Sequence, residues 1–413
     1  MDRANGTAPA AIQINFLLLA SLTVLITLTP YSVDAFLPGF PAASDALGAG
    51  TSTMQLTLTA YLLGIAGGQL IFGPLSDRFG RRGPLIVGAA VCALASVVAA
   101  LAPTIGVLIA ARLVQGIAGS AAMVICKAII RDRSTGGDTT HFLAMTAVGS
   151  GALNIFAPLI GGLLNAQFGW RGPLWFIAAI ATLMLLLVIA VVPETHAVEH
   201  RELRNRWLGL PSVVRHLRNR TFLVYVVIQA GSYGTLMAYV SSSPFVYQNV
   251  LGFDASTYGL LFSINAACGV AANFVANRFL RGLGAKRLVM WGLGLSMTGT
   301  VLTATMWAVG APVGAIAACI TLSMAPLGLN GPNLVGLALN TVTRAVGSAA
   351  ATIGFVQFIT GSFVSPLVGL WGPATLVPTL VVMFALTSFS MVFLLVSRRS
   401  ERGIQAAAVI SGG

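Results

Sequence analysis

Two charged side chains lie inside long apolar stretches of the sequence, and they are the first candidates for chemistry. The chain has 413 residues, of which 23 are Lys or Arg and 11 are Asp or Glu, yet only Asp34 and Arg112 fall within such stretches. A charge at bilayer depth costs at least about 2.5 kcal/mol, so each should face a protein interior or a wet cavity. Because burial disfavours the charged form of a carboxylate, Asp34 is a candidate proton carrier. The alternative is an interfacial carboxylate, since Asp34 lies in the outer part of its stretch.

Arg112 has two interpretations. Its guanidinium keeps its proton, so it could set the proton affinity of Asp34 or tether the site through hydrogen bonds. Alternatively, its donors bind backbone carbonyls of neighbouring helices and hold that part of the fold together. The sequence favours neither interpretation.

An enzyme would need a catalytic or metal-binding cluster, and the chain offers one candidate. Residues His196–His200 spell H-A-V-E-H, which matches the H-x-x-E-H pattern of some metalloproteases. The stretch lies in a charged linker without an evident third ligand, which favours a chance match. The four cysteines have no regular spacing and predict neither disulfides nor a zinc site. We also find no nucleotide-binding loop of the G-x-x-x-x-G-K type, and we expect no enzyme activity, no metal and no cofactor.

The elements that must hold Asp34 and Arg112 are apolar helices. Hydrophobic residues make up 56% of the chain, charged residues 8%, and the mean hydropathy is +0.88, whereas a soluble domain is roughly a quarter charged. The net charge of +12 therefore does not indicate a nucleic-acid partner, which would require a basic face on a soluble fold.

About 20 apolar residues cross a bilayer as a helix. We predict an all-α integral membrane protein with twelve such helices, at 14–40, 54–75, 83–102, 105–127, 141–164, 173–193, 221–248, 257–280, 287–308, 312–333, 346–369 and 374–396.

The basic residues lie almost entirely on one side of the predicted membrane. Segments on the side of the N-terminus carry 21 of the 23 Lys and Arg residues, while the other side carries only Arg171. The positive-inside rule then predicts a multi-pass protein of the cell inner (plasma) membrane with both termini cytoplasmic. A polar insert divides the helices into six and six. We expect a six-helix bundle of residues 1–193, a cytoplasmic linker of residues 194–220 containing a short amphipathic helix, and a second bundle of residues 221–413.

A short repeat after the second helix of each half supports this division. Asp77-Arg78-Phe79 recurs 200 residues later as Asn277-Arg278-Phe279. The first copy stands within G-P-L-S-D-R-F-G-R-R, which resembles the signature loop between helices 2 and 3 of the major facilitator superfamily. The resemblance implies two six-helix pseudo-repeats that rock about a central site. The contact that holds the inward gate shut would then be formed by Gly73, Asp77, Arg78, Gly80, Arg81 and Arg82.

Three further segments resemble the proton-coupled drug exporters of this superfamily. A-R-L-V-Q-G at 111–116 resembles their helix 4 motif, and A-P-L-I-G-G at 157–162 their helix 5 antiporter motif, matched at Pro158, Gly161 and Gly162. Ala157 stands where that motif usually has Gly. D-A-F-L-P-G-F-P at 34–41 is similar to the end of helix 1 in exporters of the bicyclomycin and chloramphenicol/florfenicol resistance type. The resemblance implies drug/proton antiport, with Asp34 and Arg112 as the proton-coupling residues.

A cavity for an amphipathic drug should be mostly apolar and aromatic with a few polar groups. Candidates that fit on the pore-forming helices are Tyr31, Phe36, Tyr61, Gln115, Asn154, Gln229, Tyr233, Tyr239 and Asn265. For each of them, packing or interhelical hydrogen bonding is the alternative role. A single acid in the cavity favours neutral or singly cationic compounds.

These observations predict a monomeric secondary transporter, in contact with membrane lipid, that exports hydrophobic or amphipathic drugs in exchange for protons. Phenicol antibiotics are the leading substrates by resemblance. The first alternative is export of an endogenous metabolite such as a sugar or amino-acid derivative, and the next is proton-driven import. A membrane enzyme or sensor is the alternative from another class.

Overall fold

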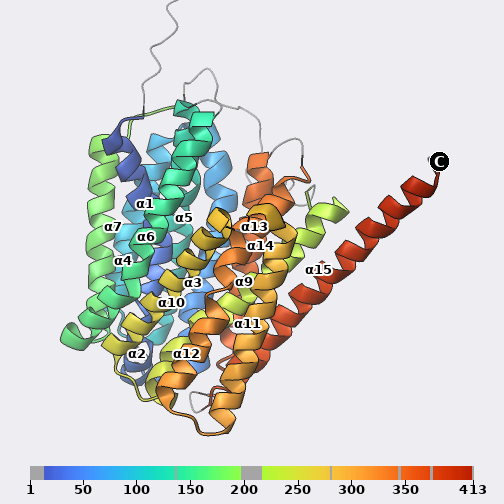
Figure 1. The fold of residues 1–413 in the computed structure, drawn as a ribbon. Coiled ribbons are helices and arrows are strands. Elements are labelled where there is room, and N and C mark those ends of the chain that lie inside the picture. Colours follow the sequence, from blue (N-terminus) through green and yellow to red (C-terminus); the bar gives the residue numbers. More distant parts are fainter. Residues whose placement is uncertain are drawn as a thin grey trace, which may run out of the picture.

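The chain folds into a bundle of long, roughly parallel and antiparallel helices (Figure 1). The structure, a computed structural model, describes residues 14–134, 137–196, 216–279, 281–342, 346–372 and 375–411, and within these ranges it contains no strand. Twelve helical segments of this part are long and apolar enough to cross a membrane. The predicted number of spans and the all-α class are therefore confirmed, and the length and apolarity of the segments make this a multi-pass membrane protein.

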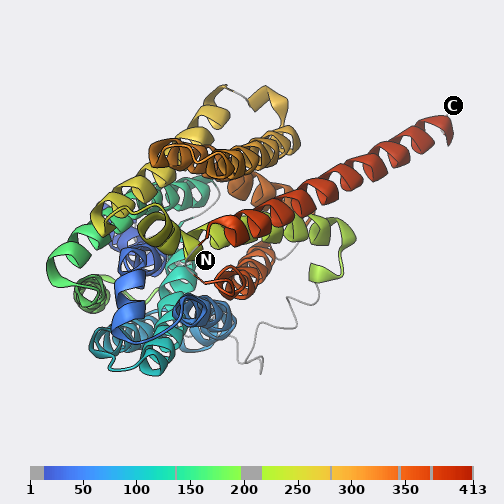
Figure 2. The ribbon, with the colours of Figure 1, turned by 90° about the horizontal axis from the view of Figure 1, so that it is seen from below.

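Helices from the first part of the chain lie on one side of the molecule and helices from the second part on the other (Figures 1 and 2). The first group consists of α1 (Phe16–Asp34), η1 (Leu37–Gly39), α2 (Phe40–Ala46), α3 (Thr51–Phe79), α4 (Arg82–Leu101), α5 (Ile105–Arg133), α6 (Gly137–Phe168) and α7 (Arg171–Val191). We call these elements the first half. Helix α5 lies at their centre, where it packs against α1, α3 and α4.

The second half follows the segment 197–215, which contains most of the predicted linker and lies outside the described residues. Its elements are α9 (Arg220–Phe245), the π-helical segment η3 (Val246–Val250), α10 (Ala255–Phe279), η4 (Arg281–Leu283), α11 (Ala285–Ala308), α12 (Val313–Met324), α13 (Leu327–Leu339), α14 (Val346–Leu367) and α15 (Val377–Ser411). The halves meet where α6 packs on α10 and α3 packs on α14. We call this contact the seam.

Two of the predicted continuous spans are wrong in detail, because the structure divides each into two helices. The span 14–40 is interrupted after Asp34, and the span 312–333 is interrupted between Met324 and Leu327. Each interruption contains a proline, Pro38 or Pro326, which supplies no backbone N–H for a continuing helix. Backbone carbonyls near such a break are available to other partners.

The predicted spans leave residues 76–82 of the signature segment as a loop, and that expectation is wrong for most of its length. Helix α3 continues to Phe79 and α4 begins at Arg82. Gly80 has a φ of +90°, a conformation that residues with a Cβ rarely adopt. The chain therefore reverses over Gly80 and Arg81 alone, and Asp77 lies in the last turn of a helix.

The end of the bundle at which α3 and α5 finish carries many cations, and we call it the basic end. Arg78, Arg82, Arg131 and Arg133 lie there in the first half, and Lys286 and Arg287 lie there in the second. The opposite end contains η1 and α2. Asp34 lies towards this opposite end, as its distance from the start of α1 requires.

Helices α3 and α5 approach so closely that a methyl group does not fit between them. A Cβ placed on Gly64 would lie 2.8 Å from the backbone nitrogen of Ile117 and would also contact the carbonyl oxygen of Leu113. Small residues at such positions let helix backbones pack together in a membrane. Gly67, one turn along the same helix, has no atom within 4 Å of its hypothetical Cβ.

These two glycines allow a matched test of the packing. We expect Gly64→Ala to lower the thermal unfolding midpoint of the purified protein in detergent, because overpacking costs about 1–3 kcal/mol. Gly67→Ala should leave the midpoint unchanged or raise it, since alanine is the better helix former. Equal midpoints for the two variants would contradict the close approach of α3 and α5.

Candidate functional site

Asp34 is the last residue of α1, and its electrostatic neighbours belong to the second half. The side chain is partly buried and forms no hydrogen bond or ion pair with any residue that the structure describes. Its electrostatic neighbours are the phenol groups of Tyr233 on α9 and Tyr258 on α10. The C-terminal end of a helix carries a partial negative charge, which disfavours a carboxylate anion there. Asp34 thus stands where its charge is costly and where both halves are within reach.

Arg112 is buried, with 1% of its surface exposed, and its donors hold α1 against α5. One terminal nitrogen donates to Oε1 of Gln115 at 2.7 Å, and the other donates to the carbonyl oxygen of Ser32 at 3.1 Å. That carbonyl is available because the break in α1 leads the amide of Phe36 to bond Val33 instead. The bond to Ser32 matches the second interpretation of Arg112, in which its donors bind backbone carbonyls of neighbouring helices, and the role of Arg112 in proton coupling stays a prediction. Arg112 and Asp34 form no ion pair in this conformation.

Aromatic rings complete the surroundings of the guanidinium. Its central carbon lies 4.2 Å from the ring centroid of Tyr61 and 5.6 Å from that of Phe36. Such cation–π contacts stabilise a desolvated arginine by about 2 kcal/mol. The hydroxyl of Tyr61 donates to the carbonyl of Thr29 at 2.8 Å. Tyr61 therefore joins α3 to the same segment of α1 that Arg112 binds.

The hydrogen-bond network of Arg112 extends to a fourth helix. Nε2 of Gln115 donates to Oγ of Ser96 at 2.7 Å, and Ser96 donates to the carbonyl of Cys92 at 2.7 Å. Oγ1 of Thr29 donates to the carbonyl of Gly119 at 3.1 Å. The network thus ties α1, α3, α4 and α5 together around one buried charge.

The second half has an uncharged cluster at matching positions. Asn265 lies 204 residues after Tyr61, and α10 begins 204 residues after α3. Nδ2 of Asn265 donates to the hydroxyl of Tyr239 at 2.6 Å, and Oδ1 accepts from Thr321 on α12 at 2.5 Å. The ring of Tyr239 stacks on Phe262 at 5.4 Å. The two halves therefore place a charged network and a neutral network at equivalent levels.

The structure divides the predicted substrate contacts among separate surroundings. The surroundings of Arg112 contain Gln115, Tyr61 and Phe36. The neutral cluster contains Tyr239 and Asn265. Tyr233 is an electrostatic neighbour of Asp34. Tyr31 packs on Phe176 of α7 within the first half. Asn154 and Gln229 each have a buried side-chain oxygen without a hydrogen-bond partner. Whether any of these residues binds substrate stays a prediction.

The seam is closed at the opposite end by contacts to the break in α1. Nε2 of Gln248 in the second half donates to the carbonyl of Pro38 at 3.1 Å. In the reverse direction, Nε2 of Gln55 in the first half donates to the carbonyl of Ser241 at 3.0 Å. Neither glutamine is recognisable from the sequence, because one polar residue near a helix end gives no distinctive signal.

Of the two glycines of the predicted antiporter motif, Gly162 lies on this seam and Gly161 faces the break in α1. A Cβ on Gly161 would collide with the carbonyl of Ala35, and one on Gly162 would lie 3.1 Å from Cα of Ser256 on α10. The carbonyl of Pro158 in turn faces Gly259 at a distance that excludes a Cβ. Helix α6 therefore contacts both the break after Asp34 and the first turns of α10.

Arg81 joins the signature turn to two other helix ends of the first half. Its side chain donates to Asp77 at 2.5 Å and to Asp132 on α5 at 2.9 Å, while its amide donates to Glu194 beyond α7 at 2.9 Å. Burial opposes the charge of Arg81, but the bonds to Asp132 and Asp77 outweigh it and raise its pKa. The pairing expected for Asp77 is present; its role in gating stays a prediction.

Glu194 caps this arrangement with its carboxylate. Burial works against ionisation, but backbone N–H groups of His196, Arg81, Arg82 and Thr195 donate to the carboxylate and lower its pKa below the ordinary 4.5. His196, from the candidate metal motif, thus contributes its backbone amide here. The other four residues of that motif lie outside the described part.

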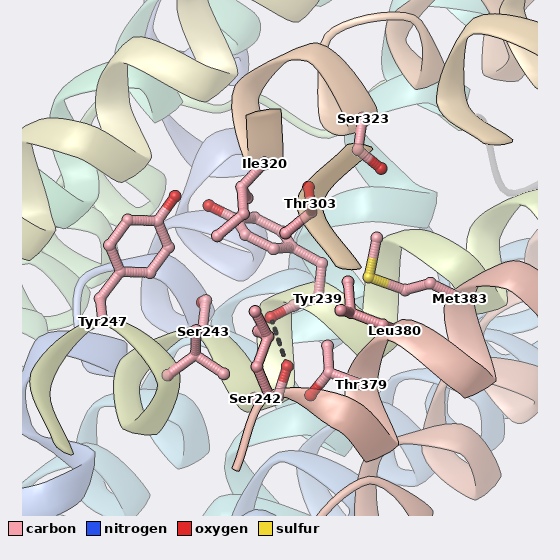
Figure 3. Close-up of a pocket in the computed structure, with 12 residues that line it drawn as sticks. Tyr239, Ser242, Ser243, Tyr247, Thr303, Ile320, Ser323, Thr379, Leu380 and Met383 are labelled. Atoms are coloured by element: carbon pink, nitrogen blue, oxygen red, sulfur yellow. Dashed lines mark hydrogen bonds between the residues drawn. The ribbon is translucent and has the colours of Figure 1, made fainter. Parts of the chain in front are cut away.

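A cavity lies within the second half, next to the end of α9 (Figure 3). It adjoins the segment where α9 gives way to η3, and residues of α9, α11, α12 and α15 surround it. The residues that line it are Tyr239, Ser242, Ser243, Val246, Tyr247, Thr303, Ile320, Ser323, Leu376, Thr379, Leu380 and Met383. Ser242 donates to the carbonyls of its own helix. The cavity leaves free space beside Tyr239 rather than between the halves.

The lowered pKa of Glu194 predicts a pH-dependent contribution to stability. A carboxylate with a depressed pKa stabilises the fold above its ordinary pKa and ceases to do so as the pH falls through the depressed value. We expect Glu194→Gln to lower the thermal unfolding midpoint at pH 7, and the difference from the unsubstituted protein to shrink as the pH falls below about 4.5. Asp45→Asn, at an exposed carboxylate, is the control. A difference that stays constant with pH would contradict the carboxylate's role.

The seam contacts predict that Gln248→Leu opens the opposite end. The substitution removes the hydrogen bond to Pro38, so a cysteine at the fully buried position 365 should react several-fold faster with a maleimide. The measurement uses protein whose four native cysteines are replaced by alanine. Gln167→Leu, at an exposed glutamine near the same end, should not change the rate. An unchanged rate for Gln248→Leu would show that this contact does not hold the seam.

Comparison with known proteins assigns this arrangement to a family. The model of the Major Facilitator Superfamily matches residues 22–366. The Bacillus subtilis MFS-type transporter YdgK is 33% identical over 92% of this chain and 94% of its own. A bicyclomycin resistance protein homolog of Haemophilus influenzae is 29% identical (91% and 94% covered), and a chloramphenicol resistance protein of Pseudomonas aeruginosa is 29% identical (89% and 86% covered).

Solved structures agree at the level of the fold. The crystal structure of a D-xylose-proton symporter superposes with a TM-score of 0.74 at 17% identity, covering 92% of this chain and 97% of that one. The resemblance expected from the signature segment is thereby confirmed, and a transporter rather than an enzyme is indicated. The chain belongs to the major facilitator superfamily.

Proposed function

We propose that this transporter exports hydrophobic or amphipathic drugs in exchange for protons, by alternating access of its two halves. The observation that carries the proposal is the position of Asp34. Its carboxylate lies at the broken end of α1, within electrostatic range of Tyr233 and Tyr258 of the second half, and has no ion-pair partner among the described residues. A carboxyl group in such surroundings changes its proton affinity when the surroundings change, which is what coupling to a rocking motion requires.

The distribution of cations supports an orientation. The basic end faces the cytoplasm in this proposal, because positively charged segments stay inside, and both termini then lie in the cytoplasm of a cell whose plasma membrane holds the protein. The opposite end faces outward, so Gln55 and Gln248 close the external side of the seam in this conformation. The halves comprise residues 1–193 and 221–413 with a linker of residues 194–220, and a single copy suffices for transport.

The exchange follows from competition between drug and proton. In the outward-open state Asp34 takes up a proton from outside, which helps to displace the drug. After the halves rock to the state with the closed outer end, drug arriving from the cytoplasm favours release of that proton. Arg112 contributes by holding the carbonyl of Ser32, and with it the segment before Asp34, in a fixed position.

The side chains near the seam suit a substrate with few charges. Tyr233 lies beside Asp34, and the neutral cluster of Tyr239 and Asn265 offers hydroxyl and amide groups among aromatic rings. A site of this composition binds apolar molecules that carry a few hydrogen-bonding groups. The names of the bicyclomycin and chloramphenicol resistance relatives support antibiotics, phenicols among them, as substrates.

The proposal is tested by expressing the chain in a bacterium that lacks its own efflux pumps. We expect higher inhibitory concentrations for some of a chemically varied set of antibiotics that includes chloramphenicol, and loss of that protection in Asp34→Asn. Purified protein in detergent should release a proton when a protective drug is added, and Asp34→Asn should not. Asp45→Asn, at an exposed carboxylate, serves as the control.

Two outcomes would contradict the proposal in different ways. Protection against no compound would favour export of an endogenous metabolite. Proton release by Asp34→Asn equal to that of the unsubstituted protein would remove Asp34 from the coupling step.

A further inference from the structure

The carbonyl of Pro38 lacks the backbone donor that its 3₁₀ segment would otherwise supply. In η1 a carbonyl accepts from the amide three residues on, as Leu37 does from Phe40. The next bond of this series would need an amide hydrogen on Pro41, and proline has none. Pro38 is buried, and a buried carbonyl without a donor is costly. This carbonyl therefore depends on side chains.

Two side-chain amides from different halves converge on the carbonyl of Pro38. Nε2 of Gln248, in η3 of the second half, donates to it at 3.1 Å. Nδ2 of Asn165, near the end of α6 in the first half, donates to it at 3.5 Å, which is longer than the usual range for such a bond. A carbonyl oxygen has two lone pairs and can accept from both amides. The closed seam thus gives Pro38 a short bond from the second half and a long bond from the first.

Asn165 and the break in α1 are packed together within the first half. A Cβ on Gly39, next to Pro38, would lie 3.4 Å from Oδ1 of Asn165 and 3.5 Å from the backbone of Trp170. Trp170 lies in the turn between α6 and α7. None of these contacts involves the second half. A separation of the halves would take Gln248 away from Pro38 and leave Asn165 beside it.

The amide of Asn165 is incompletely satisfied while the seam is closed. Its Oδ1 is buried and has no hydrogen-bond partner among the described residues, and its nitrogen makes the long bond to Pro38. Buried polar groups are normally hydrogen-bonded, so a closer approach of the carbonyl would improve the bonding of this amide. The closed seam therefore uses Gln248 as the main donor and leaves Asn165 with unused bonding capacity.

We propose that Asn165 is the donor that holds the carbonyl of Pro38 once the outer seam opens and Gln248 departs. The proposal rests on the proposed alternating access and names a residue that stabilises its outward-open state. In that state η1 settles on α6, the bond from Nδ2 of Asn165 shortens, and the carbonyl keeps a donor. Asn165 is a positioning residue, since it acts on the break that follows Asp34 and not on the substrate.

The proposal predicts opposite effects for the two donors. Asn165→Leu withdraws a donor mainly from the open state, so it should hold the seam closed. Gln248→Leu withdraws a donor from the closed state and should open the seam. One net hydrogen bond changes such an equilibrium by about two- to tenfold. The double variant, with both substitutions, should lie between the two single variants.

Maleimide labelling of Ser365→Cys, in protein whose four native cysteines are replaced by alanine, measures the opening without any drug. When opening and closing are fast relative to labelling, the rate follows the fraction of open protein. We expect Asn165→Leu to label about two- to tenfold more slowly than the unsubstituted background, and Asn165→Gln, which retains the amide, to recover the rate. Gln167→Leu, at an exposed position of the same helix, is the matched control and should leave the rate unchanged.

The direction of the change separates this role from general damage, because a loosened bundle labels faster and not more slowly. An unchanged or faster rate in Asn165→Leu, together with a faster rate in Gln248→Leu, would overturn the proposal and leave alternating access at this seam intact. Unchanged rates in both variants would reject the second donor and also the seam as the outer gate.

Two further results keep the test decisive. If Asn165→Leu does not fold, Asn165→Ala removes the donor without adding bulk and is judged by the same criterion. A slower rate in Asn165→Leu, in a protein whose Asp34→Asn variant still releases a proton on drug binding, would retain the role of Asn165 and reject only the proposed proton coupling.

Discussion

A charge buried among apolar helices has to be solvated by the protein itself, and in this transporter the solvation of Arg112 organises the first half. Its guanidinium binds the carbonyl of Ser32, which the break in α1 leaves available, and lies over the ring of Tyr61. Leaving such a group without partners would cost several kcal/mol. The position of α1 therefore depends on Arg112, and the position of Asp34, two residues further on, depends on α1.

The consequence for Asp34 is that both terminal nitrogens of Arg112 bind other groups. The buried positive charge of the first half holds helices together, and the carboxyl group of Asp34 has no ion-pair partner among the described residues. In the proposed mechanism, a carboxyl group without an ion-pair partner can change its proton affinity as the halves move. Arg112 would then hold helices together while Asp34 exchanges the proton.

The seam has to be tight when closed and still able to open. Gly162 and Gly259 allow the backbones of α6 and α10 to touch, which excludes water without a large interlocking surface. The polar contacts at the same end include single amide-to-carbonyl bonds from Gln55 and Gln248, each worth about 1 kcal/mol net. Such contacts can break one by one as the halves rock, whereas buried ion pairs would resist separation.

Sequence alone determined the twelve helices, the basic end and the two charges within the membrane, because apolar length and the cost of buried charge act locally along the chain. It also identified the signature segment, although it misjudged how far α3 continues through it. It could not identify Asn165 or Gln248, which look like ordinary residues near helix ends. Only the tertiary structure decided that Arg112 donates a hydrogen bond to the carbonyl of Ser32 and that Asp34 lies within electrostatic range of tyrosines of the second half. Helix packing selects such partners, which lie far apart in the sequence, and neither hydropathy nor local motifs encode that packing.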